Sequence, residues 1–186
     1  MLHKFVDGRI HCPQNHTRRK VKRGGIKLEI WRYTRAQFMC GKTSGDGHGP
    51  SELWETLQSS LNQPNWLVGT EREIPERPGF ATAVANRSGA NPGDLVLLRK
   101  EGDSWVGIGG YIDTILTISP DYRRKGLSTE LILRACEGRQ LPAERLVTIE
   151  GYAALAKAHG VGVRRAIAQG LLVPDVVRAE YDAEEG

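Results

Sequence analysis

A short basic turn, residues 123–128, carries the side chains of this sequence that are best suited to chemistry. Two arginines and a lysine stand directly before Gly126, and Ser128 follows after one leucine. Guanidinium and ammonium groups bind phosphate oxygens, and glycine lets the backbone approach an anion closely. We therefore expect the turn to bind a phosphate. A solvated basic turn without a ligand is the alternative.

The elements on either side of the turn are predicted to hold it in place. A β-branched run from Ile112 to Ile118 favours a strand, and Pro120 stops it because proline donates no ladder hydrogen bond. After the turn, apolar residues recur at helical spacing from Leu127 to Ala135. The first turn of such a helix directs unpaired N–H groups and the positive end of its dipole at an anion.

Two common phosphate motifs are missing from the sequence, the GxxxxGK[ST] of a P-loop and the GxGxxG of a dinucleotide fold. A GKT triplet around Lys42 lies in the glycine-rich stretch at residues 41–50, but it lacks the first P-loop glycine and a strand close before it. We interpret this stretch as a flexible connection or lid.

Residues 118–128, ISPDYRRKGLS, resemble the acyl-CoA signature of the GNAT superfamily of N-acetyltransferases. That pattern is a strand ending in an aliphatic residue, a short proline-containing turn, and Arg/Gln-x-x-Gly-x-Gly/Ala at the start of a helix. Arg123, Gly126 and Ser128 fall on its three fixed positions, with serine in place of the usual glycine or alanine. The resemblance covers residues 106–139.

The resemblance implies an α+β fold: a twisted, mostly antiparallel mixed sheet flanked by helices, with a V-shaped opening between two parallel strands for coenzyme A. It also implies N-acyltransferase activity, with acetyl-CoA or another acyl-CoA as cofactor. The acceptor is an amine, on a small molecule or a macromolecule. The residues assigned to cofactor binding are Leu116, Ile118, Arg123, Arg124, Lys125, Gly126, Leu127, Ser128 and Thr129.

Direct acyl transfer sets the demands on catalytic residues. The attacking amine must be neutral, so a base accepts its proton, and an acid near the sulfur helps the thiolate to leave. Asp113, the nearest carboxylate on the strand, is the candidate base, although it lies one residue out of register with the family's glutamate. Tyr152 and His159 are the candidate acids, with roles in packing or at the surface as the alternative. The family's tyrosine position falls on Ala158.

Length and composition predict one globular domain with a basic arm. The chain has 186 residues, 39% of them hydrophobic and 26% charged. The first fifty residues contain eleven Lys or Arg and three acids, a net charge of +8, whereas the whole chain carries +4. We therefore divide the chain into a basic, mobile arm at residues 1–24 and a single acyltransferase domain at residues 25–186.

The basic arm leaves a second function open. Its cations could bind nucleic-acid phosphates, and a non-catalytic nucleic-acid-binding protein on the same scaffold would lose affinity steeply with added salt. A coenzyme A-binding regulator without turnover is a third reading. The residues of the arm that would contact nucleic acid are Arg18, Arg19, Lys20, Lys22 and Arg23.

Cysteine usage and hydropathy point to the cytoplasm. The three cysteines are widely spaced and form no CxxC pair, so we expect no disulfide framework. His11, Cys12 and His16 lack a second ligand pair at regular spacing, and no metal is expected. We expect no signal peptide and no contact with a membrane. A homodimer stays open.

Hydrophobic patterning predicts the remaining elements. Strands are expected at residues 26–33, 66–69, 94–100 and 105–110, with the last two forming a hairpin around Gly102. Residues 80–85 form either a strand or a helical turn. A helix is expected after Ser51. A short strand within residues 141–149 should run parallel to the phosphate-binding strand. Thr148 either belongs to this strand or is the N-cap of a helix at residues 152–169.

Overall fold

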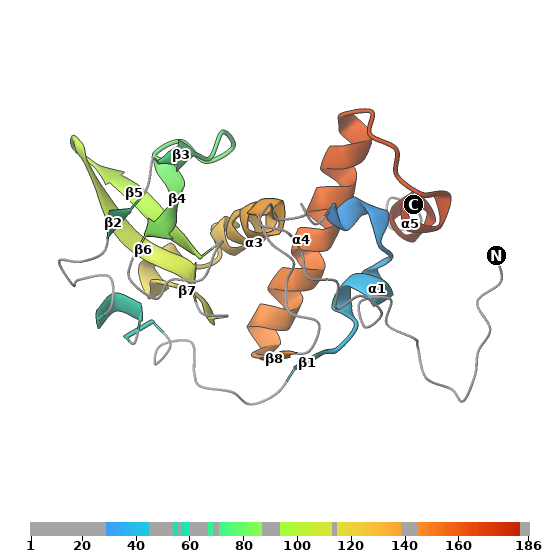
Figure 1. Ribbon diagram of the computed structural model, residues 1–186, viewed down its shortest axis with the longest axis horizontal. Coiled ribbons are helices and arrows are strands. Elements are labelled where there is room, and N and C mark those ends of the chain that lie inside the picture. The colour runs from blue at the N-terminus through green and yellow to red at the C-terminus, as the bar shows by residue number, and fades with distance from the viewer. Residues whose placement is uncertain are drawn as a thin grey trace.

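The computed structural model describes residues 29–44, 54–55, 57–59, 67–68, 71–86, 94–112, 115–138 and 145–182 (Figure 1). They combine helices and strands in an α+β arrangement, as the sequence predicts. The strands are β1 (Lys42–Ser44), β2 (Leu67–Val68), β3 (Arg72–Glu73), β4 (Phe80–Asn86), β5 (Leu95–Glu101), β6 (Ser104–Ile112), β7 (Ile115–Ile118) and β8 (Arg145–Val147). The helices with described bounds are η2 (Ile30–Arg32), α1 (Arg35–Met39), η3 (Pro120–Tyr122), α3 (Leu127–Gly138), α4 (Ile149–Ala168) and α5 (Asp175–Asp182).

An antiparallel sheet with the strand order β2-β4-β5-β6-β7 forms one side of the molecule, and β3 also pairs with β4. Side chains alternate between the two faces of a strand, so Leu95 and Leu97 of β5 pack on one face, whereas Val96 and Leu98 pack on the other. The predicted hairpin of β5 and β6 is confirmed. Gly102 in its turn has a left-handed φ of 60°, which glycine adopts without strain.

Both faces of the sheet are covered by helical residues. The apolar side of α3, including Leu131 and Ile132, packs with Ile108 of β6 in the larger core cluster. On the other face, Leu57 from the helical residues 57–59 packs with Val96. The predicted helix after Ser51 is therefore confirmed where residues 54–55 and 57–59 are described. Packing on both faces of the sheet holds β6 and β7 in position, and therefore also positions the start of α3, which follows β7.

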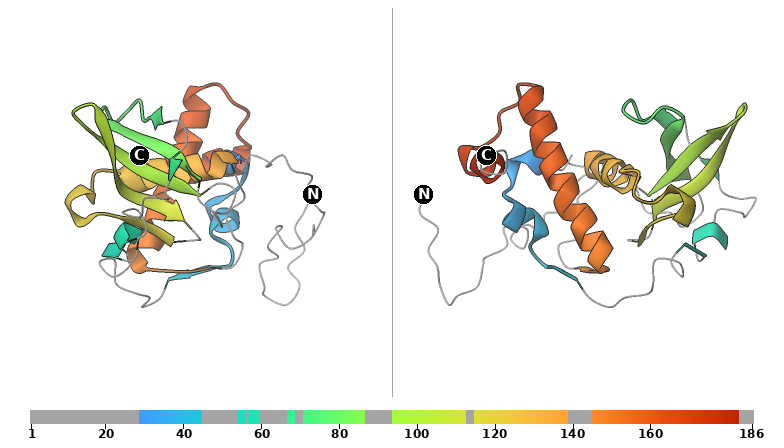
Figure 2. Two further views of the ribbon diagram at one scale, coloured as in Figure 1. Left: turned by 60° about the vertical axis from the view of Figure 1, so that its left-hand side comes forward. Right: turned by 180° about the vertical axis from the view of Figure 1, so that it is seen from behind.

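Helix α4 packs against α3 on the side away from the sheet, and α1 and α5 lie beyond α4 (Figures 1 and 2). The predicted N-cap is confirmed, because the Thr148 side chain accepts a hydrogen bond of 3.0 Å from the backbone N–H of Gly151. The helix begins at Ile149, a turn earlier than expected. Val177 and Tyr181 of α5 pack with Val163 and other residues of α4 in a separate small cluster.

Three predicted elements differ from the structure. The expected strand at residues 26–33 is wrong for its described part, because residues 30–32 form η2 and α1 follows; the Thr34 and Gln37 side chains make a reciprocal capping box that starts α1. Residues 42–44, expected in a loop, form β1. The run from Ile112 to Ile118 is not one strand, because Ile112 ends β6 and β7 begins at Ile115.

The strand predicted within residues 141–149 exists as β8, but its partner differs from the expected one. It pairs in parallel with β1, with Thr43 opposite Leu146, in a separate two-stranded sheet. Among the described residues no ladder joins β8 to β7. The sheet that contains β7 is therefore antiparallel throughout its described part, rather than mixed.

None of the described helices has both the length and the apolar character that crossing a membrane requires. Neither Cys40 nor Cys136 takes part in a disulfide within the described part of the chain, and Cys12 lies outside it.

Candidate functional site

A groove of about 380 Å³ lies between the end of β7, the basic turn, the first turn of α3 and the first turns of α4. We call it the β7–α4 groove. It joins segments that are about thirty residues apart along the chain. Its lining residues are Leu116, Thr117, Ile118, Tyr122, Arg123, Arg124, Leu127, Ser128, Thr148, Glu150, Gly151 and Ala154.

The basic turn has an unusual backbone. Arg124 has a φ of 60° and Gly126 a φ of 76°, and Arg124 is the only residue other than glycine with a positive φ among the described residues. A side chain with a Cβ atom is uncommon in this left-handed region, and such conformations concentrate at ligand sites. The result is a tight bend that leads directly into the N-terminus of α3, where Ser128 is half-buried.

Arg123 ties this bend to the strand before it. Its Nε donates a hydrogen bond of 3.0 Å to the backbone oxygen of Ile118. The side chain is half-buried at the wall of the groove. Arg124 is exposed. Arg123 therefore fixes the geometry of the turn, whereas the charge of Arg124 is open to solvent at the groove.

The free side of β7 faces away from β6. In an antiparallel pair, successive residues alternate between bonding to the neighbouring strand and pointing away from it. Ser119 N–H bonds to the oxygen of Ile108 on β6 at 2.8 Å, so Leu116 and Ile118 direct their backbone groups to the opposite side. The bond from Arg123 to the Ile118 oxygen agrees with this direction. Both residues line the groove, which can therefore accept a ligand with amide groups along the strand edge.

Tyr122 is a groove residue that the sequence analysis missed. Its hydroxyl accepts a hydrogen bond from Nη1 of Arg99, and the Lys125 Nζ lies 4.9 Å from the centre of its ring. The ring also packs edge-on against Phe80. Lys125, Gly126 and Thr129, which were assigned to cofactor binding, do not line the groove. The one signal in the sequence for Tyr122 as a groove residue was that it is the aromatic residue within the signature.

The wall formed by α4 consists of small residues and one carboxylate. Gly151 and Ala154 are three positions apart and share a face of the helix, leaving space beside β7. Glu150 is exposed and lines the groove in the first turn. Sequence reasoning identified the cap at Thr148 but not this wall. The signal was the spacing of two small residues directly after the cap.

The candidate catalytic residues are not gathered at the groove. Asp113 lies outside the described residues. Tyr152 lines a different hollow, with Arg35, Met39 and Glu180. Two helical positions correspond to about 200° of rotation, so Tyr152 points to the side of α4 opposite Ala154.

His159 is fully buried among α1, α4 and α5. Its Nδ1 lies 2.5 Å from the hydroxyl of Tyr181, and its Nε2 lies 2.8 Å from the backbone oxygen of Tyr33. Burial lowers the pKa of His159, while the contact with the Tyr33 carbonyl acts in the opposite direction. Both ring nitrogens are engaged within the protein, and the ring does not line the groove. Ala158, at the family's tyrosine position, is buried in the core.

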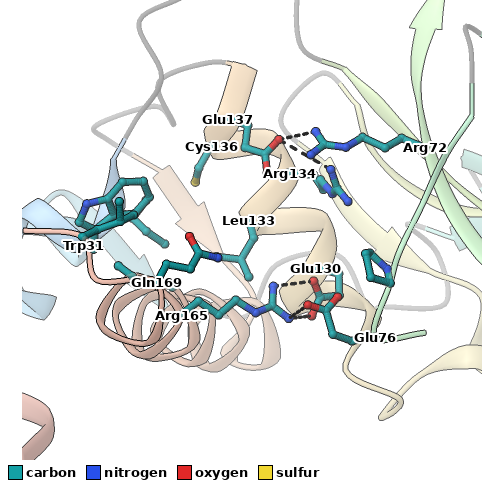
Figure 3. A pocket seen from close by; sticks show the side chains of 15 residues that line it. Trp31, Arg72, Glu76, Glu130, Leu133, Arg134, Cys136, Glu137, Arg165 and Gln169 are labelled. Atoms are coloured by element: carbon teal, nitrogen blue, oxygen red, sulfur yellow. Dashed lines mark hydrogen bonds and ion pairs between the residues drawn. The ribbon is translucent and has the colours of Figure 1, made fainter. Parts of the chain in front are cut away.

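A second cavity, of about 430 Å³, lies between α3, α4 and the segment around β3 (Figure 3). Arg165 pairs with both oxygens of the buried Glu130, at 2.9 and 2.7 Å, and lies 3.4 Å from Glu76. At the other end, Arg72 lies 2.6 Å from the carboxylate of Glu137. The hydrogen bond to Glu130 raises the pKa of Arg165. Arg134 also lines the cavity, so three arginines face three carboxylates and the cavity offers no net charge to a ligand.

The nucleic-acid candidates at residues 18–23, together with His11, Cys12 and His16, lie outside the described residues. Within the described part of the chain, no group of three His, Cys, Asp or Glu side chains is placed to hold a metal ion. Comparison with protein-family models, with curated proteins and with solved structures finds no match to this chain.

Proposed function

We propose that the protein is an N-acyltransferase that moves an acyl group, most simply acetyl, from acyl-CoA to an amine by direct attack. The observation that carries the proposal is the β7–α4 groove. It brings a strand edge, a strained basic turn and a helix N-terminus into one continuous cavity. The resemblance of residues 118–128 to the GNAT signature supports the same assignment.

In this proposal the two ends of the groove bind different parts of the cofactor. The backbone N–H groups at the start of α3, the Ser128 hydroxyl and Arg124 bind the pyrophosphate, because a helix N-terminus and a cation both favour an anion. The pantetheine arm lies along β7, where its amides meet the backbone of Leu116 and Ile118. Gly151 and Ala154 leave room for it on the opposite wall.

The reaction forms one bond and breaks one. The amine nitrogen attacks the thioester carbonyl, the C–N bond forms, and the C–S bond breaks to release the thiolate of coenzyme A. A backbone N–H at the end of β7 stabilises the charge that develops on the carbonyl oxygen. Asp113, directly after β6, is the proposed acceptor of the amine proton. Tyr152 lines a different hollow and His159 is fully buried, so the proposal includes neither residue in thiolate release.

Titration calorimetry of the full chain with acetyl-CoA tests the proposal. We expect saturable binding of one acetyl-CoA per chain, and release of free thiol when a reactive amine is added. Absence of binding at millimolar acetyl-CoA would contradict the proposal. Replacing Arg18, Arg19 and Arg23 with glutamine distinguishes the acyltransferase from the nucleic-acid-binding alternative. The substitutions should leave acetyl-CoA affinity unchanged, whereas they would weaken nucleic-acid binding through the basic arm.

A further inference from the structure

Residues 72–77 run alongside α3 and reach the basic turn at its N-terminus. The segment is held at several points: Arg72 pairs with Glu137 in the last turn of α3, and Arg134 Nη2 donates to the backbone oxygen of Glu73 at 3.3 Å. Figure 3 shows Arg72 and Arg134 with Glu137 at one end of the cavity and the group of Glu76, Glu130 and Arg165 at the other. These contacts restrain the backbone that leads to the residue after Glu76.

That residue is Arg77, whose guanidinium lies over the basic turn. Its Nε donates to the backbone oxygen of Lys125 at 3.1 Å, and its Nη1 donates to the backbone oxygen of Glu76 at 2.9 Å. A Cβ atom built on Gly126 would lie 2.9 Å from Nη2 of Arg77. Arg77 is exposed and does not line the β7–α4 groove. It therefore adds a fixed positive charge on the outer side of the turn.

The phosphates of coenzyme A carry more negative charge than the groove residues alone would neutralise, and Arg77 lies close by. A pyrophosphate diester carries about two negative charges, and the phosphomonoester on the ribose of coenzyme A adds about 1.5 to 2 more at neutral pH. Arg124 and the N-terminus of α3 face the groove, where the pyrophosphate is placed. Arg123 directs its Nε to Ile118, and Lys125 lies against the ring of Tyr122. A cation outside the groove would stabilise a further phosphate there.

We infer that Arg77 binds the ribose 3′-phosphate and makes the site selective for coenzyme A over dephospho-coenzyme A. This inference rests on the proposed acyl-CoA function of the groove. The two backbone carbonyls that orient the guanidinium reduce the conformational entropy lost on binding. A charge-assisted contact at an exposed position is worth on the order of tenfold in affinity. Added salt should reduce that factor, because exposed charges are screened.

The test compares acetyl-CoA with acetyl-dephospho-CoA by calorimetry on the full chain. Wild type should bind acetyl-CoA about tenfold more tightly, and Arg77→Gln should reduce the ratio to about one by weakening acetyl-CoA alone. Arg77→Lys should keep part of the preference. Arg178→Gln, which removes an exposed arginine on α5, is the matched control and should change neither affinity.

Each outcome separates the inference from the proposed function. If wild type binds both compounds equally well, the inference is wrong and the proposed function stands. If Arg77→Gln keeps the preference, another residue recognises the phosphate and the inference is wrong. If the variant loses affinity for both compounds equally, Arg77 only supports the turn and the inference is again wrong. If wild type binds neither compound, the proposed function itself is contradicted.

Discussion

Ser128→Glu tests the anion site without weakening the helix that carries it. Ser128 is the second residue of α3, half-buried, and lines the β7–α4 groove. A carboxylate in the first turn of a helix is stabilised by the helix dipole by about 0.3–1 kcal/mol. The substitution should therefore preserve or raise the free energy of unfolding. At the same time it places a negative charge where the pyrophosphate is proposed to bind.

The expected loss of binding follows from the charges. With the new carboxylate about 5 Å from the two pyrophosphate charges and an effective dielectric constant of about 40, the repulsion is roughly 3 kcal/mol. That corresponds to about a hundredfold weaker binding. Ser128→Gln has nearly the same size without the charge and should lose only the serine hydrogen bond, which is worth about 1 kcal/mol.

Calorimetry with acetyl-CoA measures the affinity, and urea unfolding measures the stability. Val176→Glu is the matched control, because it introduces the same charge at the second residue of α5, at a side chain that is 64% exposed. It should leave acetyl-CoA affinity unchanged. Equal affinity of wild type and Ser128→Glu, with the stability preserved, would refute the placement of the anion. Equal losses in Ser128→Glu and Ser128→Gln would refute the electrostatic argument.

Three further predictions concern the basic turn, the Arg165–Glu130 pair and the buried His159. Gly126→Ala should cost about 1 kcal/mol of stability because Gly126 has a φ of 76°, and calorimetry should show weaker acetyl-CoA binding; full affinity would mean that the bend is not required. Arg165→Met leaves the buried carboxylate of Glu130 without its bidentate partner and should lower the free energy of unfolding in urea by about 3 kcal/mol. Adding Glu130→Met should restore much of the lost stability. Equal costs for the single and double variants would contradict the pairing. Burial lowers the pKa of His159 in the folded state, so the unfolded chain binds the proton first, and stability should be complete above about pH 6.5 and decline below it. His159→Phe should flatten this decline between pH 7.5 and 5.5, and an unchanged slope would contradict the assignment.

The sequence predicted the parts of the structure that depend on short-range signals. The strand end at Ile118, the proline after it, the basic turn and the start of α3 are contiguous, so their residue types alone predict their conformation. The capping box of Thr34 and Gln37 is also local. It could have corrected the strand expected at residues 26–33, whose alternation of apolar and polar residues was the weaker signal.

The remaining features depend on contacts between distant segments. Arg77 reaches the turn from forty-eight positions away, and no periodicity in the sequence indicates that contact. The rotation of α4 about its axis, which turns Ala154 to the groove and Tyr152 away from it, is set by packing against α3 and α1. The pairing of β8 with β1 likewise joins segments about a hundred residues apart.

Helix α4 links the β7–α4 groove to the small core cluster that it forms with α5. With 20 residues, it is about 30 Å long. Its first turns form a wall of the groove, and its second half packs against α5. A tilt of about 5° around the second half would shift the first turn by roughly 2 Å, given that length. A change in the packing of Val163, Val177 and Tyr181 would therefore alter the width of the β7–α4 groove.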